Sequence, residues 1–261
     1  MTSTESIADA ECPCDYLPWD SDFFGCRIGR VRSGRFSPDA IGRIIEWCRE
    51  ERIECLYLLS ASDNPLTVAV AEKHGFYLVD VRLTFEQTLA PLRDGIVGNV
   101  RPARISDIAA LRQMARQGFR GSRFYFDPGF DTSRCDELYA VWIEQSVKGY
   151  ADFVLVAELD GQPAGFVTCH LKPGEIGDIG LIAVDAACQG RGLGQQLVTS
   201  ALRAFSDRGP RIVTVVTQGR NIRSQRLYQK CGFVIRRVDL WYHKWFNRPD
   251  IGRAVRVSNS A

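Results

Sequence analysis

The sequence of 261 residues lacks the features of several protein classes. No apolar run approaches the ~18 residues that a membrane span needs, and the longest runs, such as Ile212 to Val216, are strand-sized. Met1 to Cys12 is small, polar and acidic, without the basic region and apolar core of a signal peptide. The net charge is only +2, too small a surplus for a dedicated nucleic-acid binder. We therefore expect binding neither to nucleic acid nor to a membrane.

Clustered cysteines are also missing. The nine cysteines are odd in number and scattered, and no CxxC pair occurs. Metal ligation needs clustered thiolates at fixed spacing, and a disulfide scaffold would be shorter and denser. We therefore expect a reduced cytoplasmic protein with no metal, whose cysteines mostly pack as small hydrophobic residues.

The composition is that of an ordinary globular protein, with 45% hydrophobic and 25% charged residues. This balance excludes a collagen, a coiled-coil rod and wholesale disorder. Around residues 91–104 the composition shifts to Pro, Gly, Arg and Asn, which is typical of a linker with an entering strand. The sequence thus predicts an N-terminal domain over residues 1–90, a second domain over 91–247 and a tail over 248–261.

The second half predicts an α/β fold with a mixed sheet. Helical spacing follows Ser106-Asp107 and recurs over 135–148, with an aromatic, glycine-rich loop between. Two apolar stretches around Asp160-Gly161 indicate a β-hairpin. Strands and helices then alternate, in the order strand 177–184, helix 193–208, strand 212–217, helix 221–231 and strand 233–242. This alternation after an antiparallel hairpin predicts a mixed sheet with helices on its faces.

The first half contains a partial echo of this ending. A strand, a helix and a second strand are predicted within residues 55–85. Gly75 stands eleven positions after Asn64, Gly232 stands eleven positions after Asn221, and a phenylalanine follows each glycine. Chance similarity and a true internal repeat both stay open. If the repeat is real, the first half is a stripped copy of the second.

The most informative stretch is the glycine-rich segment 189–194, between a predicted strand and a long amphipathic helix. Glycine lets the backbone approach a ligand closely, and the first turn of a helix offers unpaired N–H groups and partial positive charge. The segment therefore predicts a phosphate or pyrophosphate site. Gln195 follows Gly194, which excludes a P-loop and breaks a Rossmann fingerprint. A tight glycine turn without a ligand is the alternative.

The pattern Gln-x-x-Gly-x-Gly at 189–194 resembles the acetyl-coenzyme A pyrophosphate loop of the GCN5-related N-acetyltransferase (GNAT) superfamily. The preceding strand, Gly180 to Val184, has the apolar pattern of the family's cofactor strand. Downstream, Asn221-x6-Tyr228-x3-Gly232-Phe233 is similar to the family's next motif. The resemblance covers residues 177–242 and the strands before them. It implies a GNAT fold, preceded by a smaller, degenerate N-terminal α/β domain.

This resemblance implies acetyl-coenzyme A as the co-substrate, at one site per chain, and it assigns roles by position. The backbone of residues 182–184 pairs with pantetheine like an added strand, and the loop N–H groups hold the pyrophosphate with help from Arg191. Asn221 lies near the pantetheine arm, and Tyr228 acts as the general acid that protonates the leaving thiolate. A helix aromatic packed on the sheet is the alternative for Tyr228, and Ala71 stands at its position in the N-terminal echo. The predicted cofactor residues are Ile182, Ala183, Val184, Gln189, Gly190, Arg191, Gly192, Leu193, Gly194, Asn221 and Tyr228.

No general base stands out in the sequence. His170 ends a strand, and Glu175 and Asp178 flank the next one, but each is interpreted as an ordinary polar or loop residue. His74 and His243 have no partner pattern and are assigned no role. Members of the superfamily often use a chain of waters, so the identity of the base stays open.

A narrower resemblance, over most of the chain, is to GNAT enzymes that acetylate the 4-amino group of TDP-linked 4-amino-4,6-dideoxyhexoses in surface-polysaccharide synthesis. Leu17 to Gly25, 119–124, 138–144 and Val216 to Asn221 carry it. It implies a small-molecule nucleotide-sugar acceptor. Aromatic rings can stack on a base or sugar and arginine can clamp a diphosphate, and core aromatics with solvated arginines are the alternative. The substrate residues predicted on this basis are Phe24, Arg123, Tyr139 and Trp142. The chain departs from the pattern at 91–101, 125–134 and the tail, so the exact sugar stays open.

Three functions from different classes remain. The favoured one is nucleotide-sugar N-acetylation, with the N-terminal domain as a wall of the acceptor site. The second is acetylation of a protein or peptide amine, and the third is a non-catalytic acyl-coenzyme A sensor, against which the intact Tyr228 argues. The oligomeric state is open, a homodimer included.

Overall fold

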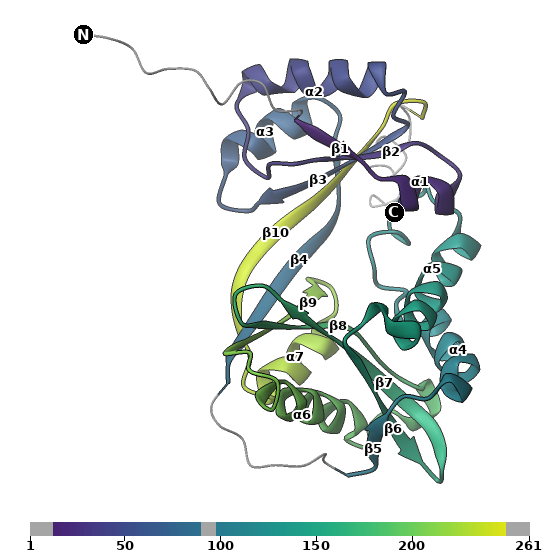
Figure 1. Ribbon diagram of the computed structural model, residues 1–261. Helices are drawn as coiled ribbons and strands as arrows, with labels where there is room; N and C mark the ends of the chain where they lie inside the picture. Colours follow the sequence, from purple (N-terminus) through teal and green to yellow (C-terminus); the bar gives the residue numbers. More distant parts are fainter. Residues whose placement is uncertain (1–12, 90–97, 249–261) are drawn as a thin grey trace, which may run out of the picture. The chain divides into compact units, whose positions relative to one another are not determined.

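The computed structural model describes residues 13–89 and 98–248 (Figure 1). Half of the predicted linker and nearly all of the predicted tail lie outside these residues. The chain divides into two compact units, one made of residues up to Val79 and from Asp239 on, the other of Asp80–Val238. The boundaries between the units therefore fall within two long strands, β4 (Tyr77–Thr88) and β10 (Val234–Trp245). The sequence predicts the boundaries at residues 90 and 247 instead. The assignment of separate roles to the two parts stays a prediction.

The first unit is a sheet with the strand order β1-β2-β3-β10. Strands β2 and β3 are parallel, and the other neighbours are antiparallel. Apolar residues of α2 such as Ile44 and Cys48 pack against Leu56 and Leu58 of β3 in a buried core. The remaining elements are β1 (Cys14–Tyr16), α1 (Pro18–Phe24), β2 (Ile28–Val31), α2 (Pro38–Glu50), β3 (Cys55–Ala61) and α3 (Pro65–Lys73).

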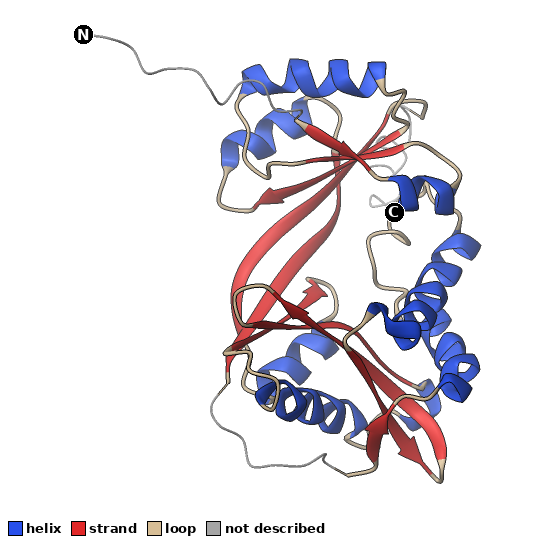
Figure 2. Ribbon diagram, in the orientation of Figure 1, coloured by secondary structure: helices blue, strands red, loops and turns tan. Residues whose placement is uncertain are grey.

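The second unit has the strand order β4-β9-β8-β7-β6-β5, and its β8 and β9 are parallel. Helices cover both faces of this sheet (Figure 2): α6 and α7 pack on one, and α4 contacts β7 and β8 from the other. Its strands are β5 (Val100–Pro102), β6 (Phe153–Leu159), β7 (Gln162–Lys172), β8 (Ile176–Val184) and β9 (Ile212–Gln218). Its helices are α4 (Ile108–Gly118), α5 (Thr132–Gln145), α6 (Leu193–Ser206) and α7 (Ile222–Lys230), with short turns η1 (Ile105–Asp107), η2 (Ser146–Tyr150) and η3 (Ala186–Cys188).

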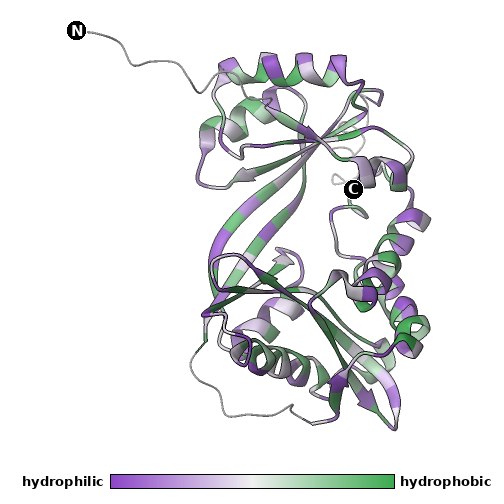
Figure 3. Cartoon of the chain, in the orientation of Figure 1, coloured by the Kyte–Doolittle hydropathy of each residue, from purple (hydrophilic) through white to green (hydrophobic). Residues whose placement is uncertain are grey.

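Polar and apolar residues alternate along β4 from Val79 to Glu86 (Figure 3), as expected for a strand whose two faces meet different surroundings. In the second unit, Leu197 and Phe205 of α6 pack on Val213 and Val215 of β9. The predicted α/β fold with a mixed sheet is confirmed. Among the helices of residues 13–89 and 98–248, none has the length and apolar character to cross a bilayer.

Helix α5 differs from the prediction at both ends. The Asp131 carboxylate accepts hydrogen bonds from the N–H groups of Ser133 and Arg134, so the helix begins before the predicted start at Cys135. It ends at Gln145 instead of Lys148, because a wider turn follows in which Gly149 has φ +109°. Both differences are local capping effects that leave the packed face of the helix as predicted.

The predicted echo has the same elements in both places. Strand, helix and strand are 7, 9 and 12 residues long in β3–α3–β4 and again in β9–α7–β10. Asn64 accepts a hydrogen bond from the backbone N–H of Thr67 at 3.1 Å, and Asn221 accepts one from Ser224 at 3.1 Å. The two helices therefore begin with the same side-chain cap.

The two helices also end alike. Gly75 has φ +78° and Gly232 has φ +91°, a left-handed conformation that favours glycine. The N–H of the following phenylalanine donates to the carbonyl of Ala71 in one case and of Tyr228 in the other, at 3.0 Å each. The backbone thus places Ala71 and Tyr228 at equivalent positions.

Strand pairing repeats the correspondence. Cys55–Ala61 of β3 pairs antiparallel with Asp239–Trp245 of β10, and Ile212–Gln218 of β9 pairs antiparallel with Arg82–Thr88 of β4. In each pair, the strand that precedes the capped helix is therefore hydrogen-bonded to a strand from the other half of the chain.

Candidate active site

Strands β8 and β9 pair along only part of their length. Ile176–Ile179 pairs with Ile212–Val215, but β8 continues to Val184 and β9 to Gln218. Beyond Ile179 the described part of β8 has a strand partner only on its β7 edge. The opposite edge offers backbone groups to an extended ligand, which can bind there as an added strand.

A cavity of about 960 Å³ opens where the two strands separate. Backbone of β8, the loop before α6, the first turn of α6 and one side of α7 surround it. It is lined by nine of the predicted cofactor residues, namely Ile182, Ala183, Val184, Gln189, Gly190, Gly192, Leu193, Gly194 and Asn221. The structure thus brings together residues that are up to 39 positions apart in the sequence. Arg191 and Tyr228, also predicted for this site, are not among the lining residues.

The three glycines of the loop serve different needs. Gly190 has φ +81° and Gly192, the N-cap of α6, has φ +79°, so other residues would be strained at both positions. At Gly194 an added Cβ would lie 3.2 Å from Leu227, so this glycine lets α6 pack closely on α7. The N–H groups of the first turn of α6 have no partner within the helix, and residues of this turn line the cavity. They form an anion-binding end of the kind that phosphate groups occupy.

Positive charge at the cavity comes from α7. Arg223, Arg226 and Lys230 all line it, and Arg223 donates a hydrogen bond to the side-chain oxygen of Gln189. Gln189 in turn donates to the carbonyl oxygen of Val184 at 3.2 Å. Sequence reasoning missed these three cations, although their spacing on a predicted helix puts them on one side of it. Arg191, predicted to add charge, is exposed on the loop.

Tyr228 is buried, with 2% of its surface exposed. Its ring centroid lies 5.7 Å from that of Phe85 and 6.0 Å from that of Phe233, inside the core of the second unit. Burial raises the pKa of Tyr228 well above its usual range, while a hydrogen bond with Ser224 lowers it. The phenol is therefore protonated, and its hydrogen-bond partner Ser224 lines the cavity. Its role as general acid stays a prediction.

Three of the predicted substrate residues gather in the second unit. The ring of Tyr139 stacks on Phe119 at 4.5 Å and meets the edge of Trp142 at 5.2 Å. The guanidinium of Arg123 lies 4.3 Å from the ring centroid of Phe124. Burial raises the pKa of Tyr139 to about 12, so its hydroxyl is uncharged. The fourth residue, Phe24, belongs to α1 of the first unit, and its contact with the acceptor stays a prediction.

A buried carboxylate lies beside this group. Asp80 is 4% exposed and its Oδ1 is 3.6 Å from Nη2 of Arg220. The guanidinium of Arg220 lies 3.5 Å from the ring centroid of Phe126. Burial raises the pKa of Asp80 to about 6, against the opposing charges of Arg220 and Arg123. Sequence reasoning missed Asp80, because its partner is distant in the chain.

The three acid–base candidates lie in different surroundings. Glu175 is exposed in a turn and pairs with Arg211 at 2.8 Å. Asp178 is largely buried, accepts a hydrogen bond from Thr214 at 2.7 Å and pairs with Lys172 at 2.7 Å. His170 is half-buried on β7, directly across from Asp178. His170 and Asp178 therefore lie opposite each other on neighbouring strands, whereas Glu175 lies outside this pair.

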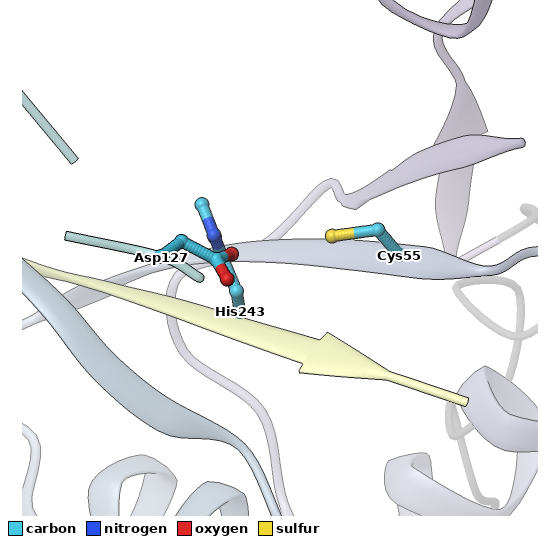
Figure 4. A group of neighbouring side chains, drawn as sticks. All are labelled: Cys55, Asp127 and His243. Carbon is cyan, nitrogen blue, oxygen red and sulfur yellow. The ribbon is translucent and has the colours of Figure 1, made fainter. Parts of the chain in front are cut away.

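Figure 4 shows Cys55, Asp127 and His243, three side chains of a kind that can ligate metals. Cys55 on β3 and His243 on β10 belong to the first unit, where the imidazole stacks on Tyr57 at 4.6 Å. Asp127 belongs to the second unit, so we do not assign these residues to one site. The expectation of no metal stays a prediction.

Comparison with known proteins agrees with this geometry. Residues 109–233 match the Acetyltransferase (GNAT) family. The chain is 28% identical over 234 residues to a dTDP-fucosamine acetyltransferase of Escherichia coli, covering 87% of this chain and 96% of that protein. It is 27% identical over 144 residues to the spore coat polysaccharide biosynthesis protein SpsD of Bacillus subtilis, covering 55% of this chain and 50% of SpsD, so the match spans only half of that relative.

A solved structure shares the fold. A GCN5-related N-acetyltransferase from Sphaerobacter thermophilus has a TM-score of 0.63 at 16% identity, over 89% of this chain and 76% of that one. This likeness concerns the fold, and the family match lies within the second unit, which contains the cavity. Residues 109–233 therefore form a GNAT acetyltransferase domain.

Proposed function

We propose that this enzyme transfers the acetyl group of acetyl-coenzyme A to the amino group of a nucleotide-linked sugar, by direct attack of the amine on the thioester. The observation that carries the proposal is the cavity at the separation of β8 and β9. The GNAT family uses acetyl-coenzyme A in general, and the cavity suits this co-substrate along its length.

Each part of the co-substrate has a fitting surface. The pantetheine amides match the open edge of β8 at residues 182–184, where an extended chain can add a strand. The pyrophosphate matches the first turn of α6 and the glycine loop. The cations of α7, Arg223, Arg226 and Lys230, supply the positive charge that a polyanion needs.

Tyr228 suits the role of general acid. Its raised pKa keeps the proton on the phenol at neutral pH, which is the protonation state that a general acid needs. Ser224 connects its hydroxyl to the cavity wall. The proton then goes from the phenol oxygen to the sulfur as the carbon–sulfur bond breaks.

The acceptor is proposed from two relatives and one group of residues. The dTDP-fucosamine acetyltransferase and the SpsD protein both carry names from amino-sugar or polysaccharide metabolism. Tyr139, Trp142 and Phe119 form an aromatic group, with Arg123 close by in sequence. Such a group suits a nucleoside or sugar face, and the arginine suits a diphosphate.

The experiment is a coupled thiol-release assay on TDP- and UDP-linked amino sugars, the free amino sugars and lysine peptides. We expect the nucleotide-linked sugar to exceed the free sugar by about a hundredfold in kcat/KM, because remote binding energy helps to place the amine. Equal efficiency for the two sugars would contradict the nucleotide-sugar proposal. Higher activity on peptides would favour a protein-amine acceptor, and no thiol release with any acceptor would favour the acyl-coenzyme A sensor.

A further inference from the structure

A row of polar side chains crosses the sheet of the second unit on the face opposite the α6 core. His170 of β7 pairs with Asp178 of β8, and Asp178 pairs with Thr214 of β9, so the three residues share one register. Val167 and Cys169 of β7 face the core that contains Tyr228, and side chains alternate along a strand. His170 therefore lies on the other face.

A bulge brings this histidine over β8. The pairing of β7 and β8 shifts between Val167 and Cys169, and the N–H of Leu181 donates to Oγ1 of Thr168 at 2.8 Å. A Cβ built on Gly180 would lie 2.9 Å from Nε2 of His170 and 2.8 Å from Oγ1 of Thr168. The backbone of Gly180 is outside the left-handed region, so space for these two groups explains the glycine.

The position of Gly180 in the sheet connects its contact with His170 to the proposed reaction. Gly180 follows Ile179, the last residue of β8 that pairs with β9, and it is exposed although it lies within a central strand. The imidazole nitrogen thus lies above the point where the two strands begin to separate. A thioester held along the open edge of β8 has its reactive end near this point.

We propose that His170 is the general base of the acetyl transfer, and this rests on the proposed function above. Nε2 of His170 takes a proton from the protonated acceptor amine, which frees the nitrogen lone pair to form the bond to the acetyl carbon. The second proton leaves this nitrogen to solvent once the bond has formed. The carbon–sulfur bond breaks, and the thiolate receives its proton from the acid on the other face of the sheet. Base and acid thus act from opposite faces on one thioester between the strands.

The charges around the imidazole suit a base that is neutral at neutral pH. Burial lowers the pKa of His170, the carboxylates of Asp178 and Asp152 raise it, and Lys172 lowers it. Both carboxylates have other partners: Asp178 binds Thr214 and Lys172, and Asp152 accepts from the N–H of Leu171 at 2.7 Å. The ring of Tyr150 meets the imidazole edge-on at 5.6 Å. The net lowering of the pKa keeps Nε2 available as an acceptor.

The test compares the parent enzyme with His170→Gln on two amines of similar shape, ethylamine and 2,2,2-trifluoroethylamine, and on the best sugar acceptor. Ethylamine is protonated at neutral pH, whereas the fluorinated amine is not. We expect kcat/KM to fall by about a hundredfold or more on ethylamine and on the sugar, and by much less on the fluorinated amine. The pH profile of the parent should fall as the imidazole is protonated, and this limb should be absent in the variant.

Acetyl-coenzyme A affinity, measured by calorimetry, should be unchanged in His170→Gln, which separates a base from a folding residue. His74→Gln, a histidine of the first unit with no assigned role, is the matched control and should keep full activity. An equal loss on both amines, or kcat/KM within about threefold of the parent on all of them, would overturn the proposal. Because the test uses simple amines, its result can be interpreted even if the enzyme does not acetylate nucleotide-linked sugars.

A second variant tests the geometry. Gly180→Ala puts a methyl group into the space next to Nε2, so it should lower kcat in the parent while acetyl-coenzyme A affinity stays the same. In the His170→Gln background the same change should have little further effect, because the base is already lost. Additive losses in the double variant would show that Gly180 acts through something other than His170.

Discussion

Strand β3, helix α3 and strand β4 match β9, α7 and β10 in length, capping and pairing register, but the cavity borders α7 and β8. In α3 the buried residues are Thr67, Val70 and Ala71, whereas Tyr228 is the buried residue of α7. Apart from Ile222 and Leu227, the rest of α7 is polar, and its cations line the cavity. The same backbone thus packs into the core in one half and lines the cavity in the other.

The elements before each set also differ. An added Cβ at Gly29 of β2 would lie 2.9 Å from the Trp47 ring of α2, and one at Gly177 of β8 would lie 2.7 Å from the Phe205 ring of α6. The helix therefore packs on a glycine of the preceding strand in both halves. But β2 ends at Val31, while β8 continues to Val184 and leads into the glycine loop. The comparison teaches that the site depends on the strand extension and loop added to a shared frame.

The largest effect is expected at Tyr228, the position that Ala71 occupies in the other half. Tyr228→Phe keeps the ring in its core position and removes the proton, so kcat should fall by ~10²–10⁴-fold with little change in acetyl-coenzyme A affinity. Steady-state kinetics and calorimetry measure both quantities. A kcat within about twofold of the parent would mean that another group protonates the thiolate.

The second-largest effect is expected in the glycine loop at 189–194, which the first half lacks. Gly192→Val forces a branched residue into φ +79° at the start of α6. We expect the affinity for acetyl-coenzyme A to fall at least about tenfold, or ~1.4 kcal/mol, by calorimetric titration of the folded variant. Unchanged affinity would remove the loop from cofactor binding.

Substitutions at the ends of α3 and α7 should destabilise the protein equally if the two halves share one backbone arrangement. Gly75→Ala and Gly232→Ala each place a Cβ at a left-handed position, with φ +78° and +91°. Each should lower the free energy of unfolding by about 1 kcal/mol in urea denaturation, since both lose the same turn geometry. A large loss for one and none for the other would argue against equivalent helix ends.

The smallest effect is expected from a matched pair of lysines. Lys230 lines the cavity as the last residue of α7, and Lys73 is the last residue of α3. Lys230→Met should weaken acetyl-coenzyme A binding by about threefold at low salt and less at high salt, because exposed charges are screened. Lys73→Met is the control and should leave binding unchanged, so equal effects would contradict a cavity-specific role for Lys230.

Local signals predicted much of the fold. The cap at Asn221, the glycine after each helix of the echo, the Asp160-Gly161 hairpin and the loop at 189–194 all depend on residues a few positions apart. These signals predicted the mixed sheet, and the resemblance that the loop carries implied nine of the residues that line the cavity. They work because turns, caps and helix ends are decided by neighbouring residues.

Such local signals could not predict contacts between segments that are distant in the sequence. The pairing of β4 with β9, the approach of Asp80 to Arg220 and the position of His170 over Gly180 arise only when the sheet is assembled. The bulge that places His170 has no distinctive local pattern. The sequence therefore predicted the loop at 189–194 more fully than the groups proposed for acid–base chemistry.

Hydrogen–deuterium exchange with and without acetyl-coenzyme A tests the central claim, that the second half alone binds the co-substrate. The account predicts protection at Gly180–Gly194 and at the start of α7, where the cavity lies. It predicts no protection in the corresponding stretch of the first half, from β2 to the start of α2. Protection of similar size in both halves, or none at Gly180–Gly194, would contradict it.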